Sequence, residues 1–170
     1  DADQLKNMFG KTVRFIPQRR QDFDSLFLVA TPVMGRQIES LLRFYFAGDI
    51  PTYATSQIYA GFPDATRDAD LNGIMFCDMP WLLTPNQMQP AVLQTVQQNI
   101  QTVWPKNYAQ LAKFYAMGVD AFYLTGQINK MQSQPSVGVP SATGALYLTP
   151  QHVIYRQLLW AQFQNGIPQL

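Results

Sequence analysis

The feature that most constrains the fold is an alternation of short apolar strands with an amphipathic helix in the first half of the chain. An unbroken apolar run at 25–30 stops at Thr31, which is typical of a strand buried on both faces of a parallel sheet. Apolar residues then recur at helical spacing over 38–46, and further strands are predicted at 52–55 and 73–79. This order of strands and helix predicts an α/β sheet with right-handed crossovers.

The second half of the chain has a different pattern. Apolar positions at helical spacing predict three consecutive helices over 84–131, the second closed by Gly118 and the third capped by Asp120. Strands at 145–148 and 153–156 flank a turn and predict a hairpin. We therefore expect helices and a hairpin to follow the α/β part.

Length and charge set limits on the class of protein. The 170 residues suit one domain, and 47% apolar residues are enough for a packed core. Only 14% of residues are charged and the net charge is +1, so no overall field favours nucleic acid or an anionic membrane. No apolar run approaches the length of a membrane span. We expect a globular domain that does not bind nucleic acid.

Motifs for phosphate and metal binding are incomplete. Residues 10–12 resemble the end of a P-loop, but Leu5 stands where that motif requires its first glycine. Residues 68–73 resemble the opening of an EF-hand calcium loop, but Met79 stands where a bidentate glutamate is required. The sequence therefore predicts no metal, no cofactor and no catalytic residue.

The single cysteine and the single histidine allow one catalytic alternative. Cys77 excludes an internal disulfide, and a nucleophilic Cys77 would need His152 as its base. The usual meaning of a cysteine in an apolar strand is a small buried side chain, and His152 lies in a predicted turn. An enzyme that uses Cys77 is the weakest of the hypotheses.

Polar side chains follow three predicted strands. Thr31 ends the first strand, Ser56 follows the second and Asp78 ends the third. Ligands of open α/β sheets bind at the carboxyl ends of the strands, so these residues are candidates for lining a crevice. Capping of their own loops is the alternative role for the same side chains.

Three tracts resemble one bacterial family. Residues 28–32, 44–56 and 68–81 resemble the C-terminal domain of the LppC/LpoA family of lipoproteins, within a likeness that runs from about Phe15 to Gly166. The later tracts are similar to the ending of type I periplasmic binding proteins of the leucine/isoleucine/valine class; they are 118–121, 143–146 and 163–168.

The resemblance implies a fold. The expected fold class is α/β: a parallel-sheet sandwich with helices on both faces, forming one lobe of a type I periplasmic-binding-protein-like fold. A helical crossover segment at 81–135 and a C-terminal hairpin are expected in addition. Residues 1–170 would then form a single α/β domain, which corresponds to the C-terminal lobe of a larger two-lobed domain.

The resemblance also implies a function. Such proteins are non-catalytic regulators that bind and activate a class A penicillin-binding protein in peptidoglycan synthesis. They lie in the periplasm at the inner face of the outer membrane, held by a lipid anchor that would lie outside this chain. Aromatic residues in polar loops, namely Tyr59, Phe62 and Trp81, are the predicted partner contacts. The alternative function is a periplasmic small-ligand binding module whose crevice is lined by Thr31, Ser56 and Asp78.

Overall fold

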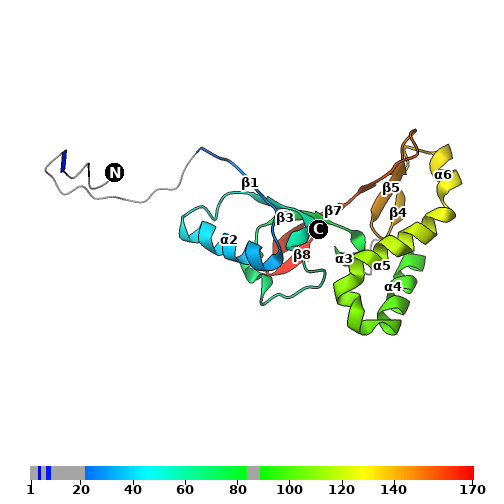
Figure 1. Ribbon diagram of the computed structural model, residues 1–170, viewed down its shortest axis with the longest axis horizontal. Coiled ribbons are helices and arrows are strands. Elements are labelled where there is room, and N and C mark those ends of the chain that lie inside the picture. Colours follow the sequence, from blue (N-terminus) through cyan, green and yellow to red (C-terminus); the bar gives the residue numbers. More distant parts are fainter. Residues whose placement is uncertain (1–3, 5–6, 9–21, 84–88) are drawn as a thin grey trace.

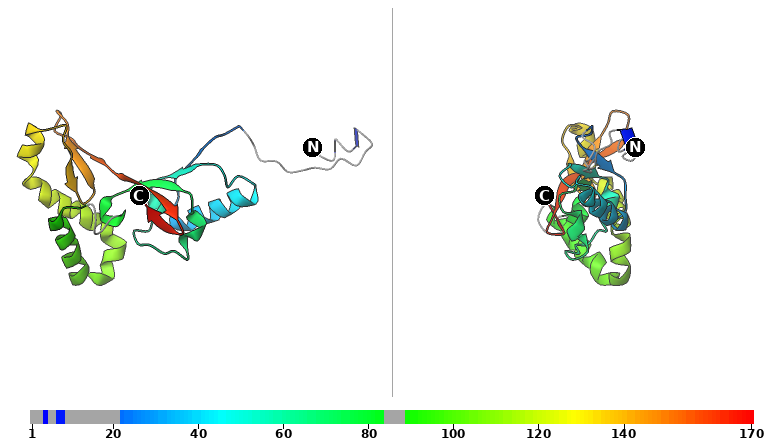
Figure 2. Two further views of the ribbon diagram at one scale, coloured as in Figure 1. Left: turned by 180° about the vertical axis from the view of Figure 1, so that it is seen from behind. Right: turned by 90° about the vertical axis from the view of Figure 1, so that its left-hand side faces the viewer.

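The molecule is elongated and consists of two units that lie end to end (Figures 1 and 2). The computed structural model describes residues 4, 7, 8, 22–83 and 89–170. We call residues 22–83 and 158–170 the sheet unit, and residues 89–157 the helical unit. The views from the front and from behind both place the two units side by side along the long axis.

The sheet unit is built on a mixed sheet whose described strands have the order β1-β2-β3-β7-β8. Strands β1 (Leu26–Leu28), β2 (Thr52–Ala54) and β3 (Met75–Asp78) are parallel. Strand β7 (Leu159–Gln164) is antiparallel to β3, and β8 (Ile167–Gln169) is antiparallel to β7. The α/β class and the three parallel strands are confirmed. The sheet is mixed because the chain returns from the helical unit in the opposite direction.

One face of this sheet carries the core. Phe76 and Phe163 stack there with ring centroids 4.9 Å apart, and Tyr59 packs against both. The elements that cover this face are helix α2 (Pro32–Phe44) and two short 3-10 turns, η1 (Ser56–Ile58) and η2 (Asp68–Leu71). Aromatic stacking between strands that are distant in sequence fixes the sheet against these elements.

The other face of the sheet is open within the described part of the chain. Phe27 is 69% exposed and Trp160 is 61% exposed, and the Trp160 ring lies edge-on against the ring of Tyr53 in β2. The expectation that 25–30 is buried on both faces is therefore wrong, because side chains of a strand alternate and α2 covers only one side. For the same reason, the described helices do not sandwich the sheet from both faces.

Helix α2 packs closely on the core because of one glycine. Thr31 is its N-cap residue and Pro32 occupies the first turn, where a missing N–H costs nothing. Gly35 lies against the side chains of Ile58 and Leu71, where any Cβ would collide with Ile58. The glycine lets the helix backbone approach the core directly.

The helical unit contains helices and an antiparallel sheet. Its described elements are helices α4 (Ala91–Val103), α5 (Pro105–Thr125) and α6 (Ile128–Ser133) and strands β4 (Val139–Ser141), β5 (Gly144–Leu148) and β6 (Ile154–Gln157). Strands β5 and β6 pair as the predicted hairpin, with His152 exposed in its turn. The predicted hairpin is confirmed. The predicted start of α4 near Pro85 lies outside the described residues.

Helix α5 differs from the sequence prediction. It runs unbroken from Pro105 to Thr125, so Gly118 does not end one helix and Asp120 does not cap another. A glycine inside a helix costs only about 1 kcal/mol relative to alanine, which the packing of a long helix readily offsets. The Asp120 carboxylate is used elsewhere, as described below.

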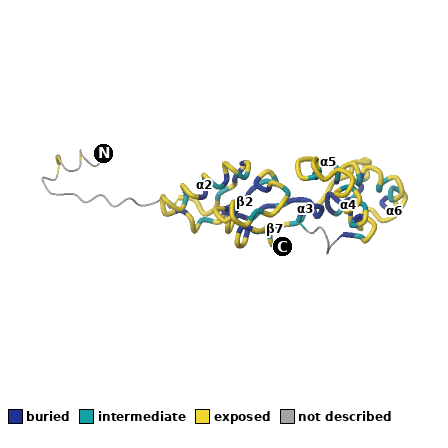
Figure 3. Tube along the Cα trace, turned by 90° about the horizontal axis from the view of Figure 1, so that it is seen from below, coloured by how far each residue is buried: buried dark blue, intermediate teal, exposed yellow. Residues whose placement is uncertain are grey.

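The two units share a buried junction. Helix α3 (Pro80–Leu83) leaves the end of β3, and its Trp81 is 1% exposed. The burial-coloured trace shows the dark, buried segments meeting around α3 (Figure 3). Small residues Ala112 and Ala116 of α5 belong to the same core cluster as the sheet residues. Beside this connection, Leu158 alone separates β6 from β7, whose first residue Leu159 pairs with Asp78 at the end of β3.

We expect Phe163→Ala to lower the free energy of unfolding by about 3–5 kcal/mol, because it empties a fully buried ring position. Phe44, which is 73% exposed at the end of α2, provides the matched control. Phe44→Ala should change the free energy by no more than about 0.5 kcal/mol. Urea unfolding of the two variants measures the difference, and equal losses would contradict the core assignment.

The only glutamate of the chain gives a pH-dependent prediction. Glu39 is a buried residue of α2, 5% exposed, and burial raises its pKa, an effect that Arg43 and a hydrogen bond with Thr52 partly oppose. Because the folded pKa lies above the unfolded value, Glu39 stabilises most at low pH, and this contribution is lost as the pH rises through the folded pKa.

Glu39→Gln removes this titration. Its free energy of unfolding, relative to the unaltered chain, should therefore rise between about pH 4 and pH 8. Urea unfolding across this range is the measurement. A difference that stays constant with pH would show that the Glu39 carboxyl has the same pKa in the folded and unfolded chains.

Candidate functional site

The candidate site lies where the parallel strands of the sheet unit end and the helical unit begins. Parallel strands present their carboxyl ends at one edge of a sheet, so β2 and β3 deliver Ser56 and Asp78 to the same place. Helix α5 of the helical unit approaches this edge next to α3 (Figure 1). The strand ends therefore face a helix of the other unit.

A lysine of α5 occupies the space between the strand ends. The Lys113 ammonium lies 2.9 Å from Oδ2 of Asp78 and donates a hydrogen bond of 2.9 Å to the backbone carbonyl of Ser56. Sequence reasoning missed Lys113, because it is 57 residues from Ser56 and looks like any other cation on a helix. The structure thus brings two of the three predicted crevice residues together through a side chain from the other unit.

Asp78 is the most deeply buried charged group at this edge. Its residue is 1% exposed, and its Oδ1 accepts a hydrogen bond of 2.8 Å from the backbone N–H of Met79. Burial raises the pKa of the carboxyl, while Lys113 and the Met79 N–H act in the opposite direction. Burial also raises the pKa of Tyr59, with smaller contributions from the charges of Asp68 and Asp78. The lysine is thus the cation that compensates a buried carboxylate.

Thr31 stands apart from this contact. It is the exposed N-cap residue of α2, and its backbone carbonyl accepts a hydrogen bond from Gly35. The contacts found for Lys113 join Ser56 and Asp78 only. A crevice lined by all three residues stays a prediction, with Lys113 as an added member.

The predicted partner contacts are mostly internal. Tyr59 is 5% exposed and Trp81 is 1% exposed, because one packs on Phe76 and the other fills the junction between the units. Phe62 is 47% exposed. Polar neighbours in the sequence suggested surface loops, but both aromatics turn inward, so only Phe62 is available on the surface in this conformation.

A polar network holds the junction around Trp81. The Trp81 backbone N–H donates a hydrogen bond of 3.0 Å to the carbonyl of Ala142. The Trp81 carbonyl accepts a hydrogen bond of 2.8 Å from the Gln97 side-chain amide. The same amide nitrogen lies 2.7 Å from the Tyr108 hydroxyl. Helices α3, α4 and α5 and the β4–β5 loop are therefore joined by hydrogen bonds in a buried place, where such bonds are most specific.

Asp120 secures the β4–β5 loop. Its carboxylate accepts hydrogen bonds from the backbone N–H groups of Ala142 at 2.7 Å and Thr143 at 2.8 Å, and from the Thr143 hydroxyl at 2.6 Å. Asp120 is 4% exposed. The tracts 118–121 and 143–146, which both resemble periplasmic binding proteins, thus touch each other directly.

The remaining candidates from the sequence do not gather into a site. Asp68 is buried and pairs with Arg36 at 2.7 Å, and no group of three or more potential metal ligands occurs among the described residues. Cys77 is half-buried in β3, whereas His152 lies in the hairpin turn of the other unit. Residues 10–12 lie outside the described part. No described helix is long and apolar enough to cross a membrane.

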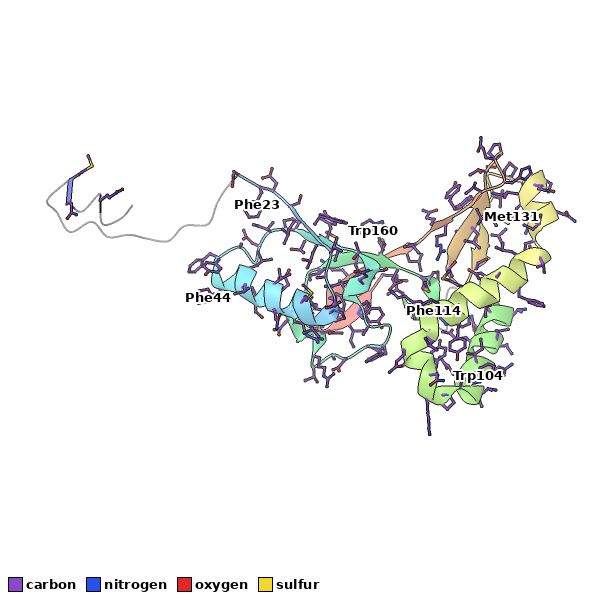
Figure 4. The ribbon with its side chains drawn as sticks, viewed as in Figure 1. Phe23, Phe44, Trp104, Phe114, Met131 and Trp160 are labelled. Atoms are coloured by element: carbon purple, nitrogen blue, oxygen red, sulfur yellow. The ribbon has the colours of Figure 1, made fainter. Side chains whose placement is uncertain are left out.

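Two apolar surfaces are exposed. A groove of about 480 Å³ runs between α4 and α5, where Trp104, Phe114 and Phe122 are among the lining residues (Figure 4). A shallower hollow of about 290 Å³ lies on the open face of the sheet beside Trp160. A hollow of about 850 Å³ along α2 is more polar and includes Arg67.

The comparison with protein families gives one decisive match. The family model described as "LppC putative lipoprotein" matches residues 1–166. The chain belongs to the LppC family. The resemblance deduced from the sequence tracts is therefore confirmed.

Relatives of known name are activators. A "Penicillin-binding protein activator LpoA" from Erwinia tasmaniensis is 30% identical over 145 residues, which are 84% of this chain and 20% of the relative. The Haemophilus influenzae protein of that name is 26% identical over 162 residues, 94% of this chain and 27% of the relative. The chain spans about a fifth to a quarter of the length of these relatives.

Solved structures support the fold. The C-domain of LpoA (YraM) from Haemophilus influenzae, described as a regulator of PBP1A, superposes with a TM-score of 0.68 at 22% identity. This match covers 99% of this chain and 49% of that chain. A "putative branched-chain amino acid ABC transporter" from Chromobacterium violaceum superposes with a TM-score of 0.54 at 25% identity, and the match covers 95% of this chain and 52% of that chain. The likeness to a lobe of a periplasmic binding protein is confirmed.

We expect Asp120→Ala to lower the free energy of unfolding by about 3 kcal/mol or more, because two buried backbone N–H groups lose their acceptor. Gln110, exposed on the same helix, gives the control Gln110→Ala, with a change of no more than about 0.5 kcal/mol. Urea unfolding measures both. A loss at Asp120 no larger than at Gln110 would refute its role in holding the loop.

Proposed function

We propose that this chain is part of a non-catalytic regulator that binds a class A penicillin-binding protein and activates it in peptidoglycan synthesis. The observation that carries the proposal is the alignment of 84% of the chain with an activator of that description at 30% identity. Because the chain spans only part of these relatives, the proposal assigns it a contribution to binding and leaves the rest of the activity to the longer protein.

The surface supports a protein as the partner. Only 14% of residues are charged, so a polyanion has little to bind. The exposed large side chains include Phe44, Tyr45 and Phe46 at the end of α2, and Phe122 on α5. Aromatic side chains are enriched in protein–protein interfaces, where they bury much area for little loss of conformational entropy.

Activation needs no chemistry in this chain. A regulator that binds the active conformation of an enzyme more tightly than the inactive one shifts the population towards the active form. A coupling of about 1–3 kcal/mol changes the equilibrium by roughly 5- to 150-fold. The proposal therefore requires only contacts that favour one conformation of the partner.

The place of action follows from the family. A lipoprotein that regulates peptidoglycan synthesis would lie in the periplasm, at the inner face of the outer membrane of a Gram-negative bacterium. The membrane would be reached only through a lipid carried outside this chain. The low charge of the chain agrees with a protein that is not itself attracted to an anionic membrane surface.

We expect saturable binding when the chain is titrated with a purified class A penicillin-binding protein and followed by calorimetry. Phe62→Ala should weaken binding by about 1 kcal/mol or more, because Phe62 is the predicted contact that is exposed. Phe23→Ala, at an exposed position that belongs to none of the surfaces named above, is the matched control. Absence of binding, both by this chain and by the complete two-lobed domain, would refute the proposal.

A small-ligand binding module is the alternative, and one observation favours it. The fold is similar to that of a putative branched-chain amino acid ABC transporter, and Ser56 and Asp78 lie at the carboxyl ends of parallel strands, where open α/β sheets bind ligands. A ligand that binds there would raise the melting temperature with its concentration. Thermal unfolding with leucine, isoleucine and valine tests this alternative, and an unchanged melting temperature would count against it.

A further inference from the structure

We propose that Lys113 acts as a latch between the two units: its ammonium contacts to Asp78 and Ser56 set the angle between the sheet unit and the helical unit. The inference does not depend on the proposed function. It rests on three observations at the junction, which concern the kind of surface that the units share, the ion pairs that cross it, and the exposure of the two partners.

The buried alanines of α5 at the junction do little to fix the position of this helix against the sheet unit. The fully buried apolar residues of α5 in the shared core are Ala112 and Ala116, which are 3% and 0% exposed, and Tyr108 and Val119 of the same helix pack against this core while partly buried. Methyl groups on a helix make a smooth surface, whereas interlocking large side chains would fix the position of one element on another. Small sliding motions of packed helices are the usual shear mechanism of domain movement. The Trp81 hydrogen bonds described above position α3 on the helical unit, and the small-residue stripe of α5 needs a directional contact of its own to position it on the strand ends.

Lys113 supplies that directional contact. It follows Ala112 directly on α5 and reaches a carboxylate at the end of β3 and a carbonyl just after β2, each at 2.9 Å. The other ion pairs found among the described residues, Arg36–Asp68 and Arg67–Asp64, lie within the sheet unit. Within that part of the molecule, Lys113–Asp78 is thus the ion pair that joins the units.

The two partners differ in exposure, which determines how the contact can open. The Lys113 side chain is 35% exposed and the Asp78 side chain is 1% exposed. The lysine can turn into solvent on its flexible stem, although its departure leaves the buried Asp78 carboxylate without its cation and so opposes release. Asp78 keeps the hydrogen bond from Met79 when the lysine leaves. Release therefore frees α5 without removing every donor from the buried carboxylate.

The test measures the distance between the units. Ser40 on α2 and Gln132 on α6 are exposed and lie in different units, so Ser40→Cys and Gln132→Cys accept spin labels in a Cys77→Ser background. Pulsed electron–electron double resonance then reports the distribution of distances between them. Circular dichroism of each labelled chain confirms that it is folded.

We expect a narrow distribution for the parent and a broader, shifted one for Lys113→Met. The double variant Asp78→Asn with Lys113→Met should also broaden it. This second variant leaves no buried unpaired charge, so it keeps the test decisive if Lys113→Met alone fails to fold. Lys113→Arg should preserve the narrow distribution, because a cation of similar reach remains.

Lys106→Met is the control, since Lys106 lies exposed at the start of the same helix. It should leave the distribution unchanged. Folded Lys113→Met or double-variant chains that keep the parent distribution would overturn the proposal. A broadening as large in Lys106→Met would overturn it as well, because the effect would then come from loss of any charge on α5.

Discussion

Two buried carboxylates at the junction determine how the rest of the molecule is arranged. A carboxylate out of water must be compensated by donors, and both of these are compensated largely by distant segments of the chain. Asp120 is satisfied by the β4–β5 loop, and Asp78 by Lys113 in addition to its neighbour Met79. The Asp120 carboxylate lies on α5, and the Asp78 carboxylate pairs with Lys113 of α5. The arrangement of both units therefore depends on the position of α5.

The elements that could be predicted from the sequence are those that depend on nearby residues. Strands at 52–55 and 73–79 and the hairpin at 145–156 show their period within a few positions, and the structure has them. Gly118 and Asp120 are local signals for helix termini, and here they misled. Hydrogen bonds from 142–143 outweigh the local preference, and these bonds are not visible in the flanking residues.

The candidate site was only partly predictable for a related reason. Strand order places Ser56 and Asp78 at one edge of the sheet, which periodicity can indicate. The cation between them comes from a helix in the other unit, so no spacing rule could point to Lys113. The burial of Tyr59 and Trp81 was equally hidden, because both follow predicted strands in short segments with no clear period, while their spatial neighbours are aromatic rings and helices. Burial depends on the three-dimensional neighbours.

The exposed apolar surfaces agree with the share of the relatives that this chain represents. The chain covers 49% of the Haemophilus influenzae C-domain on which it superposes. The groove between α4 and α5 and the open face of the sheet are both apolar and lie in different units. Contiguous apolar surfaces of this kind mark places where a protein meets another protein surface, in the same polypeptide or in a separate one.

The single residue between β6 and β7 has a mechanical consequence. Strand β6 is bonded to β5 in one unit and β7 to β3 in the other, so each end of this stretch is clamped in a separate sheet. Any rotation of one unit against the other must, on this side of the molecule, be absorbed by the backbone torsions at Leu158. The stretch 154–164 therefore couples the two sheets, because a single residue offers few torsions in which to absorb a rotation between them.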